Sequence, residues 1–418
     1  MEKSHYFLII YSYVKEKFLY NYMKIIKYTY KFRLRPTKEQ ENLLNKHFGS
    51  IRWSYNYFLN QRKQEYLNNK KSVNYYDQSR ELTQLKKKEE TKWLKETNAQ
   101  SLQFSLNNLD MAYQNFFNKR VKFPRFKSKK SKNSFTVPQH VKNEGNKIYF
   151  PKFNEGIRMV MEREIKGKIK KATLIKTPTG KYFVSILTEK EYTPANKTNK
   201  SIGIDLGLKD FLVLSNGSKI KNQRFLKYYE RILTKNQKHL SRKRKGSNRY
   251  ERQRLKVAKI HEKITNSRMD LIHKTTFNLI KDFDKIYLED LNVKGMMKNY
   301  RLAKSISDAS WGKFIDILTY KAEWNDKEII HIDRFFPSSK TCHKCGYINN
   351  SLTLKDRSWT CPDCGENHDR DVNASINILN EGYRKNISGG TSDYKRRAQI
   401  RLSQESISNE ALKEKKLI

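Results

Sequence analysis

Three observations predict an α/β protein built from more than one domain. A lone strand pattern at residues 23–36 precedes a long stretch of helical periodicity, and strand patterns return only after Ser134. This order favours a β-barrel interrupted by a helical insertion. From Ser201 onward, short apolar strands alternate with helices, which indicates a second α/β domain. Two Cys-x-x-Cys pairs between residues 342 and 364 predict a small metal-held insert in that second domain.

The charge of the chain requires a polyanionic partner. The 418 residues include 87 Lys and Arg against 43 Asp and Glu, and the net charge of +44 is spread along the chain. Many of the 25 tyrosines and 21 phenylalanines lie among basic residues, as stacking on bases beside phosphate contacts requires. No stretch approaches the roughly 18 apolar residues of a membrane span. We therefore expect a nucleic-acid partner and no membrane.

Both ends of the chain are expected to lie outside the folded domains. Residues 1–22 have no signal-peptide pattern, and Met23 stands directly before the first strand, so they are interpreted as a non-essential extension. Residues 386–418 are mostly polar and are expected to be disordered. All four cysteines lie in the two pairs and leave none for disulfides, which favours a reducing cytoplasm and, with the charge, association with the nucleoid.

The first domain is expected to span residues 23–190. Tyr28, Tyr30, Phe32 and Leu34 alternate with basic residues in a half-buried strand. The pattern Thr37-x-x-Gln40 is a capping box that begins a helical lobe over residues 37–118. The aromatics of this lobe recur at helical spacing and are assigned to its core.

Residues 119–190 are expected to complete the barrel and to carry a basic loop. The loop, residues 119–132, has eight basic side chains and no acid, which is typical of a phosphate-tracking segment. Its candidate nucleic-acid contacts are Lys119, Arg120, Lys122, Arg125, Lys127, Lys129 and Lys130. The strands after it are predicted at 147–150, 157–161, 172–175 and 182–187, with a turn at residues 177–180.

The second domain is expected to begin after a polar linker at residues 191–200. Its first part covers 201–336, its insert 337–367 and its last part 368–385. Residues 221–270 hold 17 basic and 4 acidic side chains, so the helical pair predicted at 221–280 is a second candidate nucleic-acid surface. The candidate contacts at its tip are Arg242, Lys243, Arg244 and Lys245. Further on, the patterns predict a strand at 285–289, a helix over 308–324 and a strand at 328–335.

The insert has the spacing of a two-knuckle zinc ribbon. Two residues separate the cysteines of each pair, 15 residues separate the pairs, and a glycine follows each pair where a tight turn is needed. Four thiolates fill a tetrahedral site, which predicts one structural Zn²⁺ per chain and leaves His343 and His368 outside the ligand set. The ligands are Cys342, Cys345, Cys361 and Cys364.

Three acids mark a candidate catalytic site. Asp205 lies inside a strand, Glu289 ends another, and Asp371 stands at the start of the last helix. A ribonuclease-H-like fold gathers carboxylates in this way, because two neighbouring strands and the last helix meet at one edge of its sheet. Hydrolysis of phosphodiesters by two Mg²⁺ ions ~4 Å apart requires such anionic ligands. Asp369 competes for the third position, and we favour Asp371, with Asp369 as the helix cap.

Several motifs together resemble the TnpB family, insertion-sequence-encoded proteins related to type V CRISPR effectors. They are IGIDLGLKD, KIYLEDLNVKGM, SSKTCHKCG, WTCPDCGENHDRDVNASINIL and the early YKFRLRPTKEQENLLNKHFGSIRWSYNYFLN. The resemblance spans residues 24–380. It implies a wedge-type β-barrel with an inserted helical recognition lobe, followed by a RuvC nuclease domain with an inserted zinc ribbon. Asp205, Glu289 and Asp371 fall on the three RuvC positions. The extension and the histidine after the first cysteine depart from the family pattern.

The resemblance further implies an RNA-guided, metal-dependent DNA endonuclease. A guide RNA from the transposon end would bind the protein, and double-stranded target DNA would be recognised beside a short adjacent motif and cut on both strands. Two other functions fit part of the pattern. A transposase would use the same acid triad for strand transfer, and a non-catalytic zinc-ribbon protein would leave the presence of all three acids unexplained.

Overall fold

A computed structural model describes residues 23–130, 133–353 and 355–387. The chain divides into two compact units, one formed by Lys24–Tyr192 and one that begins at Thr193. The predicted extension, residues 1–22, lies outside the described residues, and so does the predicted tail after residue 387. The tail is expected to begin at residue 386, but residues 386 and 387 belong to the last helix. No helix in the described part of the chain has the length and apolar character needed to cross a membrane.

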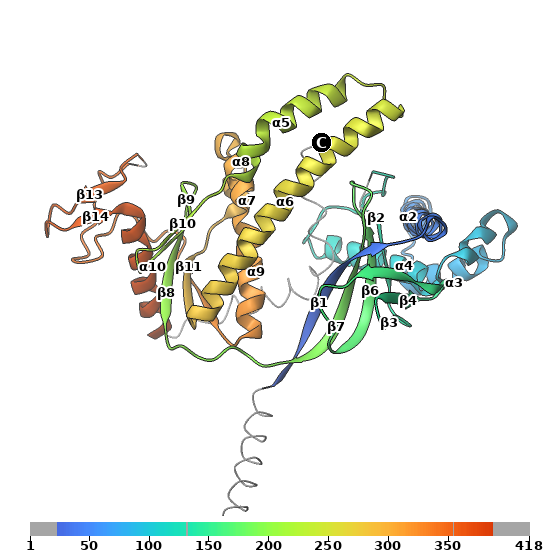
Figure 1. The fold of residues 1–418 in the computed structure, drawn as a ribbon, viewed down its shortest axis with the longest axis horizontal. Coiled ribbons are helices and arrows are strands. Elements are labelled where there is room, and N and C mark those ends of the chain that lie inside the picture. Colours follow the sequence, from blue (N-terminus) through green and yellow to red (C-terminus); the bar gives the residue numbers. More distant parts are fainter. Residues whose placement is uncertain (1–22, 131–132, 354, 388–418) are drawn as a thin grey trace, which may run out of the picture. The chain divides into compact units, whose positions relative to one another are not determined.

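The first unit contains a seven-stranded antiparallel sheet (Figure 1). Its strands are β1 (Lys24–Arg35), β2 (Asn133–Val137), β3 (Lys142–Glu144), β4 (Lys147–Phe150), β5 (Phe153–Val160), β6 (Lys168–Lys176) and β7 (Tyr182–Tyr192). The alternation predicted for the first strand is confirmed, since Tyr30, Phe32 and Leu34 are buried between exposed basic residues. The strand order is β2-β6-β7-β1-β5-β4-β3, so the described ladder has ends at β2 and β3, and barrel closure remains a prediction.

A helical block is inserted between β1 and β2, as the periodicity predicted. It consists of α2 (Lys38–Asn69), α3 (Tyr75–Leu85), the 3₁₀ helix η1 (Glu89–Glu96) and α4 (Ala99–Phe117). The capping box is present, because the Thr37 side chain accepts from the Gln40 amide while the Gln40 side chain accepts from the Thr37 amide. Phe48 and Phe58 are buried in a core shared with the sheet, which confirms that these aromatics pack rather than stack on bases.

The second unit is built on a five-stranded mixed sheet. Its strands are β8 (Ser201–Leu206), β9 (Asp210–Leu214), β10 (Lys219–Lys221), β11 (Lys285–Glu289) and β12 (Glu328–Ile332). They follow the order β10-β9-β8-β11-β12. The first three form an antiparallel meander, while β11 runs parallel to both β8 and β12. Strand β8 is therefore central, and its carboxyl end lies at the same edge as that of β11. The last strand is shorter than predicted and ends at Ile332.

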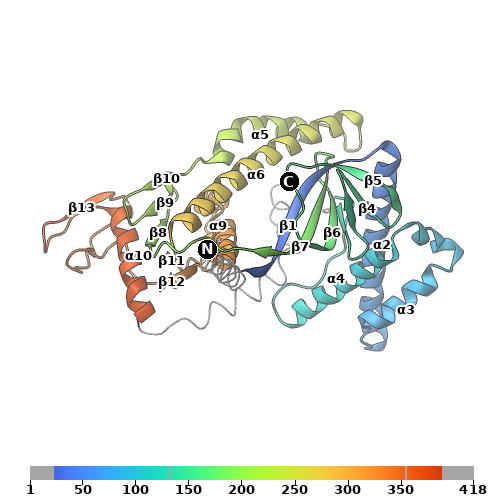
Figure 2. The same ribbon diagram turned by 60° about the horizontal axis from the view of Figure 1, so that its bottom comes forward.

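Helices α5 (Phe225–Ser241) and α6 (Asn248–Asp282) form the predicted basic pair and lie side by side (Figures 1 and 2). They are followed by α7 (Val293–Met296), α8 (Tyr300–Ala309), α9 (Trp311–Trp324) and, after the ribbon, α10 (Arg370–Ile387). The prediction of one helix over 308–324 is wrong. Ser310 adopts a left-handed conformation with φ 54° and ends α8. The Asp308 carboxylate turns to accept from the Leu226 amide at 3.0 Å, and so fixes the start of α5.

The predicted linker is held against the second unit over much of its length. The amides of Thr198 and Asn199 donate to the Asp284 carboxylate at 2.9 and 2.6 Å. Lys327, whose side chain is fully buried, pairs with the same carboxylate and donates to the Asn196 carbonyl. Burial alone would raise the pKa of Asp284, but these hydrogen bonds and the Lys327 charge hold it at about 2. Residues 196–199 therefore belong to the folded unit rather than to a free tether.

Candidate functional site

Asp205 and Glu289 lie side by side at the edge of the second sheet. In the parallel ladder Ile204 pairs with Leu288, so Asp205 and Glu289, the next residues of β8 and β11, lie at the same level near the carboxyl ends of these strands. Successive side chains of a strand point to opposite faces, and Asp205 and Glu289 therefore share one face. The sequence predicted this pair from strand position alone.

Helix α10 brings the third acid to this edge because two glycines allow it to approach the sheet closely. A methyl group on Gly203 of β8 would lie 2.2 Å from the Ser375 carbonyl oxygen of α10. A methyl group on Gly382 of α10 would lie 1.9 Å from the buried Tyr287 ring of β11. Neither position has room for a side chain. The helix start, with Asp371 in its first turn, is consequently fixed beside the end of β8 (Figure 1).

The three carboxylates interact through their charges. Burial, followed by the charges of Glu289 and Asp371, raises the pKa of Asp205 to about 7. The charge of Arg370, the first residue of α10, opposes this shift. Burial also raises the pKa of Glu289, and a hydrogen bond from Ser338 works against that increase. The site therefore concentrates negative charge that a cation would stabilise.

Asp369 has a different role from Asp371. Its Oδ1 accepts from the amides of Asp371 and Val372 at 3.2 and 3.1 Å, which is how a cap begins a helix. Its Oδ2 lies 2.6 Å from Lys219 Nζ. Burial tends to raise the pKa of Asp369, but the hydrogen bonds and the Lys219 charge hold it below the ordinary value. Asp369 is thus occupied within the protein, while an oxygen of the Asp371 carboxylate lies 3.7 Å from an Arg357 nitrogen.

Three polar residues around this site were not identified from the sequence. Ser338 is buried and donates to Glu289 Oε1 at 2.5 Å, so it fixes that carboxylate. Asn377 on α10 donates to the carbonyls of Ser338 and Thr341, and Asn373 donates to the Thr341 carbonyl. The two asparagines are four residues apart on the apolar face of a helix. That spacing of amides among buried positions was the signal available in the sequence.

The four predicted zinc ligands come together in the ribbon. The ligand atoms of Cys342, Cys345, Cys361 and Cys364 all lie within 4.8 Å of one another. In the described part of the chain they are the one group of three or more candidate metal ligands gathered this tightly. The four cysteines therefore form a candidate metal site.

The two cysteine turns of the ribbon have the same backbone design. Gly346 and Gly365 have φ of 83° and 71°, a region that favours glycine. Each glycine amide donates to the carbonyl of the first cysteine of its pair, at 3.0 and 2.9 Å. Strands β13 (Ser358–Thr360) and β14 (Asn367–Asp369) pair beside the second turn. The predicted glycine turns are confirmed.

Both histidines of the ribbon lie next to the cysteines. His368 is buried, and its Nε2 is 3.1 Å from the Cys342 sulfur. The ring centres of His343 and His368 are 4.9 Å apart. The Nδ1 atom of His343 is 3.0 Å from Asn373 Oδ1. His368 thus lies against the Cys342 sulfur and His343 is tied to α10, while their exclusion from the zinc ligand set stays a prediction.

Most of the predicted nucleic-acid contacts are exposed. In the loop after α4, six of the seven candidates have exposed side chains, namely Lys119, Arg120, Lys122, Arg125, Lys129 and Lys130. Lys127 is the exception. Its ammonium lies 3.8 Å from the centre of the Tyr55 ring. Its backbone amide donates to the Asn56 side-chain oxygen, and its carbonyl accepts from the Asn56 side-chain nitrogen. Lys127 therefore anchors the loop to α2 instead of presenting a charge to solvent.

The candidates at the tip of the α5–α6 pair lie in the turn between the two helices. Arg242, Arg244 and Lys245 are exposed there, and Lys243 is partly buried.

Three family models match successive parts of the chain. The model described as "Helix-turn-helix domain" matches residues 23–71, which here form a strand and the single long helix α2. The model described as "Probable transposase" (OrfB_IS605) matches residues 183–300. The model described as "Cas12f1-like, TNB domain" matches residues 311–378, which contain the ribbon and the start of α10.

Whole-chain comparisons agree with these models. A Streptomyces pristinaespiralis protein named "Putative RNA-guided DNA endonuclease" is 38% identical over 88% of this chain and 92% of its own length. The Escherichia coli K12 protein "Putative RNA-guided DNA endonuclease InsQ" is 32% identical over 85% and 92%. A solved Cas12f1–sgRNA–target DNA complex shares the fold, with a TM-score of 0.50 and 14% identity over 85% of this chain and 99% of that one. The chain therefore belongs to the OrfB/TnpB family, whose curated relatives are named as RNA-guided DNA endonucleases.

Proposed function

We propose that this protein is an RNA-guided, metal-dependent DNA endonuclease that hydrolyses phosphodiesters at Asp205, Glu289 and Asp371. The observation that carries the proposal is the gathering of these three acids at one sheet edge, in a chain whose family members are named for this activity. Strand transfer by the same acids is not favoured by the comparisons.

The three acids suit hard divalent cations. Carboxylate oxygens are the ligands that Mg²⁺ prefers. Burial, and after it the charges of Glu289 and Asp371, raise the pKa of Asp205, and positive charge that enters the site would relieve this repulsion. Two Mg²⁺ ions would activate water and stabilise the leaving 3′ oxygen. The protein's own part is to hold the carboxylates. Ser338 fixes Glu289, and Asp369 caps α10 so that Asp371 is held at the end of β8.

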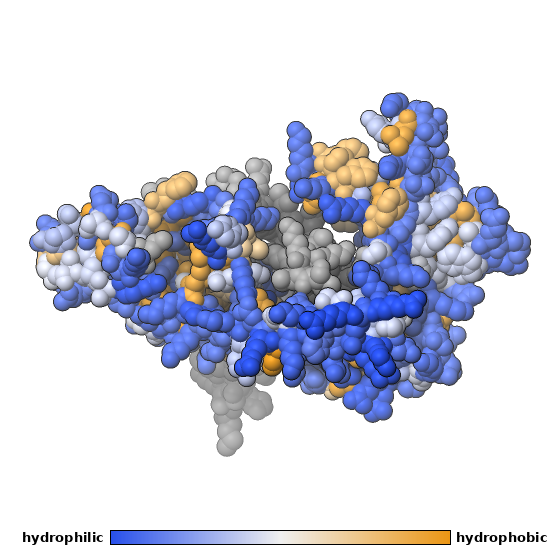
Figure 3. Space-filling model, turned by 90° about the horizontal axis from the view of Figure 1, so that it is seen from above, coloured by the Kyte–Doolittle hydropathy of each residue, from blue (hydrophilic) through white to orange (hydrophobic). Residues whose placement is uncertain are grey.

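The surface charge supports nucleic acids as partners. The face shown in Figure 3 is covered mainly by hydrophilic side chains. A net charge of +44 could neutralise more phosphates than the roughly 10 contacts made by a typical DNA-binding dimer. A structured guide RNA from the transposon end together with double-stranded target DNA, recognised beside a short motif, would use that excess. The basic loop after α4 and the α5–α6 pair are the surfaces we assign to them.

Zn²⁺ is the ion we propose for the four cysteines, and its role is structural. A closed four-thiolate site leaves no position open for water. The ion would hold both cysteine turns and, through the Asn373 and Asn377 contacts, the segment that carries Ser338.

The first prediction concerns the guide. The protein purified from its host should carry a discrete RNA of transposon-end sequence. When the guide portion of that RNA is replaced, cleavage of a plasmid library should move to the matching new sequence, because base pairing rather than protein contacts selects the target. Sequencing of the cut ends provides the measurement.

Two matched variants serve as controls for the guide experiment. Asp371→Asn should abolish cutting, by at least about 10²-fold given the scale of electrostatic contributions to catalysis, and should retain RNA and DNA binding. Asp369→Asn preserves a capping side chain and should cut within a few-fold of the wild type.

RNA-free protein that joins transposon ends would establish a transposase instead. The reverse behaviour of the two variants would overturn the assignment of the third ligand.

The second prediction concerns the ribbon. Cys361→Ser removes one thiolate and should lower the zinc content from one to near zero per chain, because three thiolates no longer close the site. The variant should also cleave DNA more weakly, since the ribbon positions Ser338 and α10. Elemental analysis measures the metal. Asn350→Ala, an exposed change elsewhere in the ribbon, should keep both zinc and activity. Wild-type protein without zinc would refute the proposed site.

The third prediction concerns pH and stability. The pKa of Asp205 is about 7 in the folded chain, against an ordinary value of 3.8, so the folded state retains a proton that the unfolded state releases. The stability that protonated Asp205 contributes is therefore present in full below pH 3.8 and is lost as the pH rises through 7. Without Mg²⁺, Asp205→Asn should unfold at a higher temperature than the wild type at pH 8, and this gain should shrink at pH 5.

Thermal unfolding at the two pH values measures the effect. Asp316→Asn changes an exposed acid on α9 and should show no pH-dependent gain. A Tm for Asp205→Asn at or below that of the wild type at pH 8 would contradict a pKa of Asp205 that is raised by burial and by the charges of Glu289 and Asp371.

A further inference from the structure

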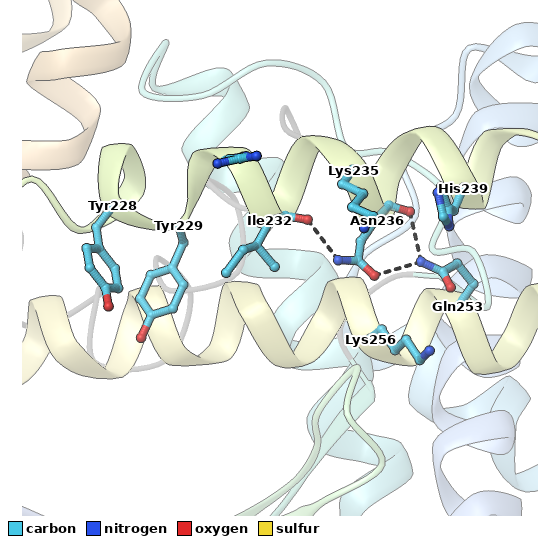
Figure 4. A pocket seen from close by; sticks show the side chains of 9 residues that line it. Tyr228, Tyr229, Ile232, Lys235, Asn236, His239, Gln253 and Lys256 are labelled. Atoms are coloured by element: carbon cyan, nitrogen blue, oxygen red, sulfur yellow. Dashed lines mark hydrogen bonds between the residues drawn. The ribbon is translucent and has the colours of Figure 1, made fainter.

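A groove lies between α5 and α6, on the surface of the second unit (Figure 4). Its volume is about 860 Å³. Along α5 the lining begins with two tyrosines, continues with Arg231 and Ile232, and ends with a lysine, an asparagine and a histidine. The full lining is Tyr228, Tyr229, Arg231, Ile232, Lys235, Asn236, His239, Gln253 and Lys256.

The lining of the groove combines aromatic surface with positive charge. It contains no acidic side chain. The acid nearest in sequence, Glu230, is paired with Lys304 of α8. A second hollow of about 440 Å³ shares Arg231, Lys235 and His239 with the first, and it too is lined without an acid. This side of α5 therefore presents cations next to apolar rings.

The apolar groups of the groove are exposed to an unusual degree. Tyr228 is 76% exposed and Ile232 52%. The Tyr229 ring lies 4.9 Å from that of Tyr228 and nearly perpendicular to it, so it covers little of the Tyr228 surface. The helix is anchored to the unit elsewhere, through Leu233, its one buried side chain. The packing of α5 on the second unit consequently does not depend on Tyr228 or Ile232.

The polar side chains on the floor of the groove are already hydrogen-bonded within the protein. Gln253 of α6 is buried, and its side-chain amide donates to both the backbone and the side-chain oxygen of Asn236, at 3.0 and 2.9 Å. Asn236 in turn donates to the Ile232 carbonyl at 2.8 Å. These bonds join the two helices at a fixed spacing. Because the side-chain amides of Asn236 and Gln253 are used in these bonds, they offer few donors or acceptors to the edge of a base.

We propose that the α5–α6 groove binds unpaired nucleotides of a nucleic-acid strand, with a base stacked on Tyr228 and the adjoining phosphates bound by Lys235 and Lys256. Stacking on an exposed ring requires a base face that is not covered by a neighbouring pair, which selects a single strand over a duplex. Because the floor offers few groups to read base edges, recognition is tolerant of sequence. This inference rests on the proposed nuclease function, and it adds the strand type and the residues that bind it.

Binding of a single strand of about 12 nucleotides, within the usual site size, tests the proposal. RNA and DNA versions of one sequence, each with a 2-aminopurine reporter, are titrated into the full chain without Mg²⁺. Tyr228→Ala should weaken binding by about 5- to 150-fold, the effect of losing one stacked base, and should remove the quenching of the reporter. Tyr228→Phe keeps the ring and should bind as the wild type does.

Two further variants separate stacking from general charge. Tyr76→Ala removes a tyrosine that is 73% exposed on the other unit and should change nothing. The double change Lys235→Ala and Lys256→Ala removes two phosphate contacts, so the slope of log K against log salt should fall by about 1.4. Equal affinities for Tyr228→Ala and Tyr76→Ala would overturn the proposal.

Photocrosslinking identifies the strand in the assembled complex. Guide RNA carrying 4-thiouridine and target DNA carrying 4-thiothymidine are placed in turn in complexes of the inactive Asp371→Asn chain. A crosslink to the peptide that contains Tyr228 supports the proposal and assigns the groove to the strand that carried the label. If neither strand crosslinks there while wild-type cleavage still follows the guide, the groove proposal fails and the nuclease function stands.

Discussion

Three carboxylates that repel one another are held together at one edge of a sheet, and the close packing of α10 on β8 and β11 is the constraint that keeps them there. Without a side chain at Gly203 or Gly382, the helix backbone and the Tyr287 ring can approach within distances that any other residue would block. Apolar contacts along α10, including the fully buried Ile378, offset the electrostatic cost at its start. Arrangements that are unfavourable for stability are common at active sites, and the grouping of these three acids fits the metal site that we propose.

The ribbon and the acid site form one structural system. The chain enters the ribbon after Ser338, which bonds to Glu289, and leaves it at Asp369, which caps the helix bearing Asp371. Asn373 and Asn377 join the start of the ribbon to the same helix. A metal bound by the cysteines would therefore order the two segments that flank the carboxylates. This explains in physical terms why a non-catalytic ion should affect a catalytic step.

Patterns that repeat locally could be predicted from the sequence. The alternation in β1, the capping box at Thr37 and the spacing of the cysteines each depend on neighbouring residues, and all three agree with the structure. The acids could be ranked because strand ends and helix starts are visible in the pattern. Asp369 has the contacts of the helix cap that we expected, and Asp371 as the third metal ligand stays a prediction.

Features that depend on distant partners could not be predicted. The break at Ser310 accompanies a turn of Asp308 toward Leu226, more than 80 positions earlier in the chain. Lys127 appears in the sequence as one more basic residue, and only the nearby Tyr55 ring withdraws it from solvent. The docking of Thr198 on Asp284 and the bond from Ser338 to Glu289 likewise join segments that no local pattern relates.

Anomalous diffraction from crystals grown with Mn²⁺ would test most directly whether the three acids form a metal site. We expect two peaks between Asp205, Glu289 and Asp371, about 4 Å apart as in other two-metal sites, and their loss in Asp371→Asn crystals. Peaks that lie beside Asp369 instead, or crystals in which Mn²⁺ occupies no position among the three acids, would contradict this assignment.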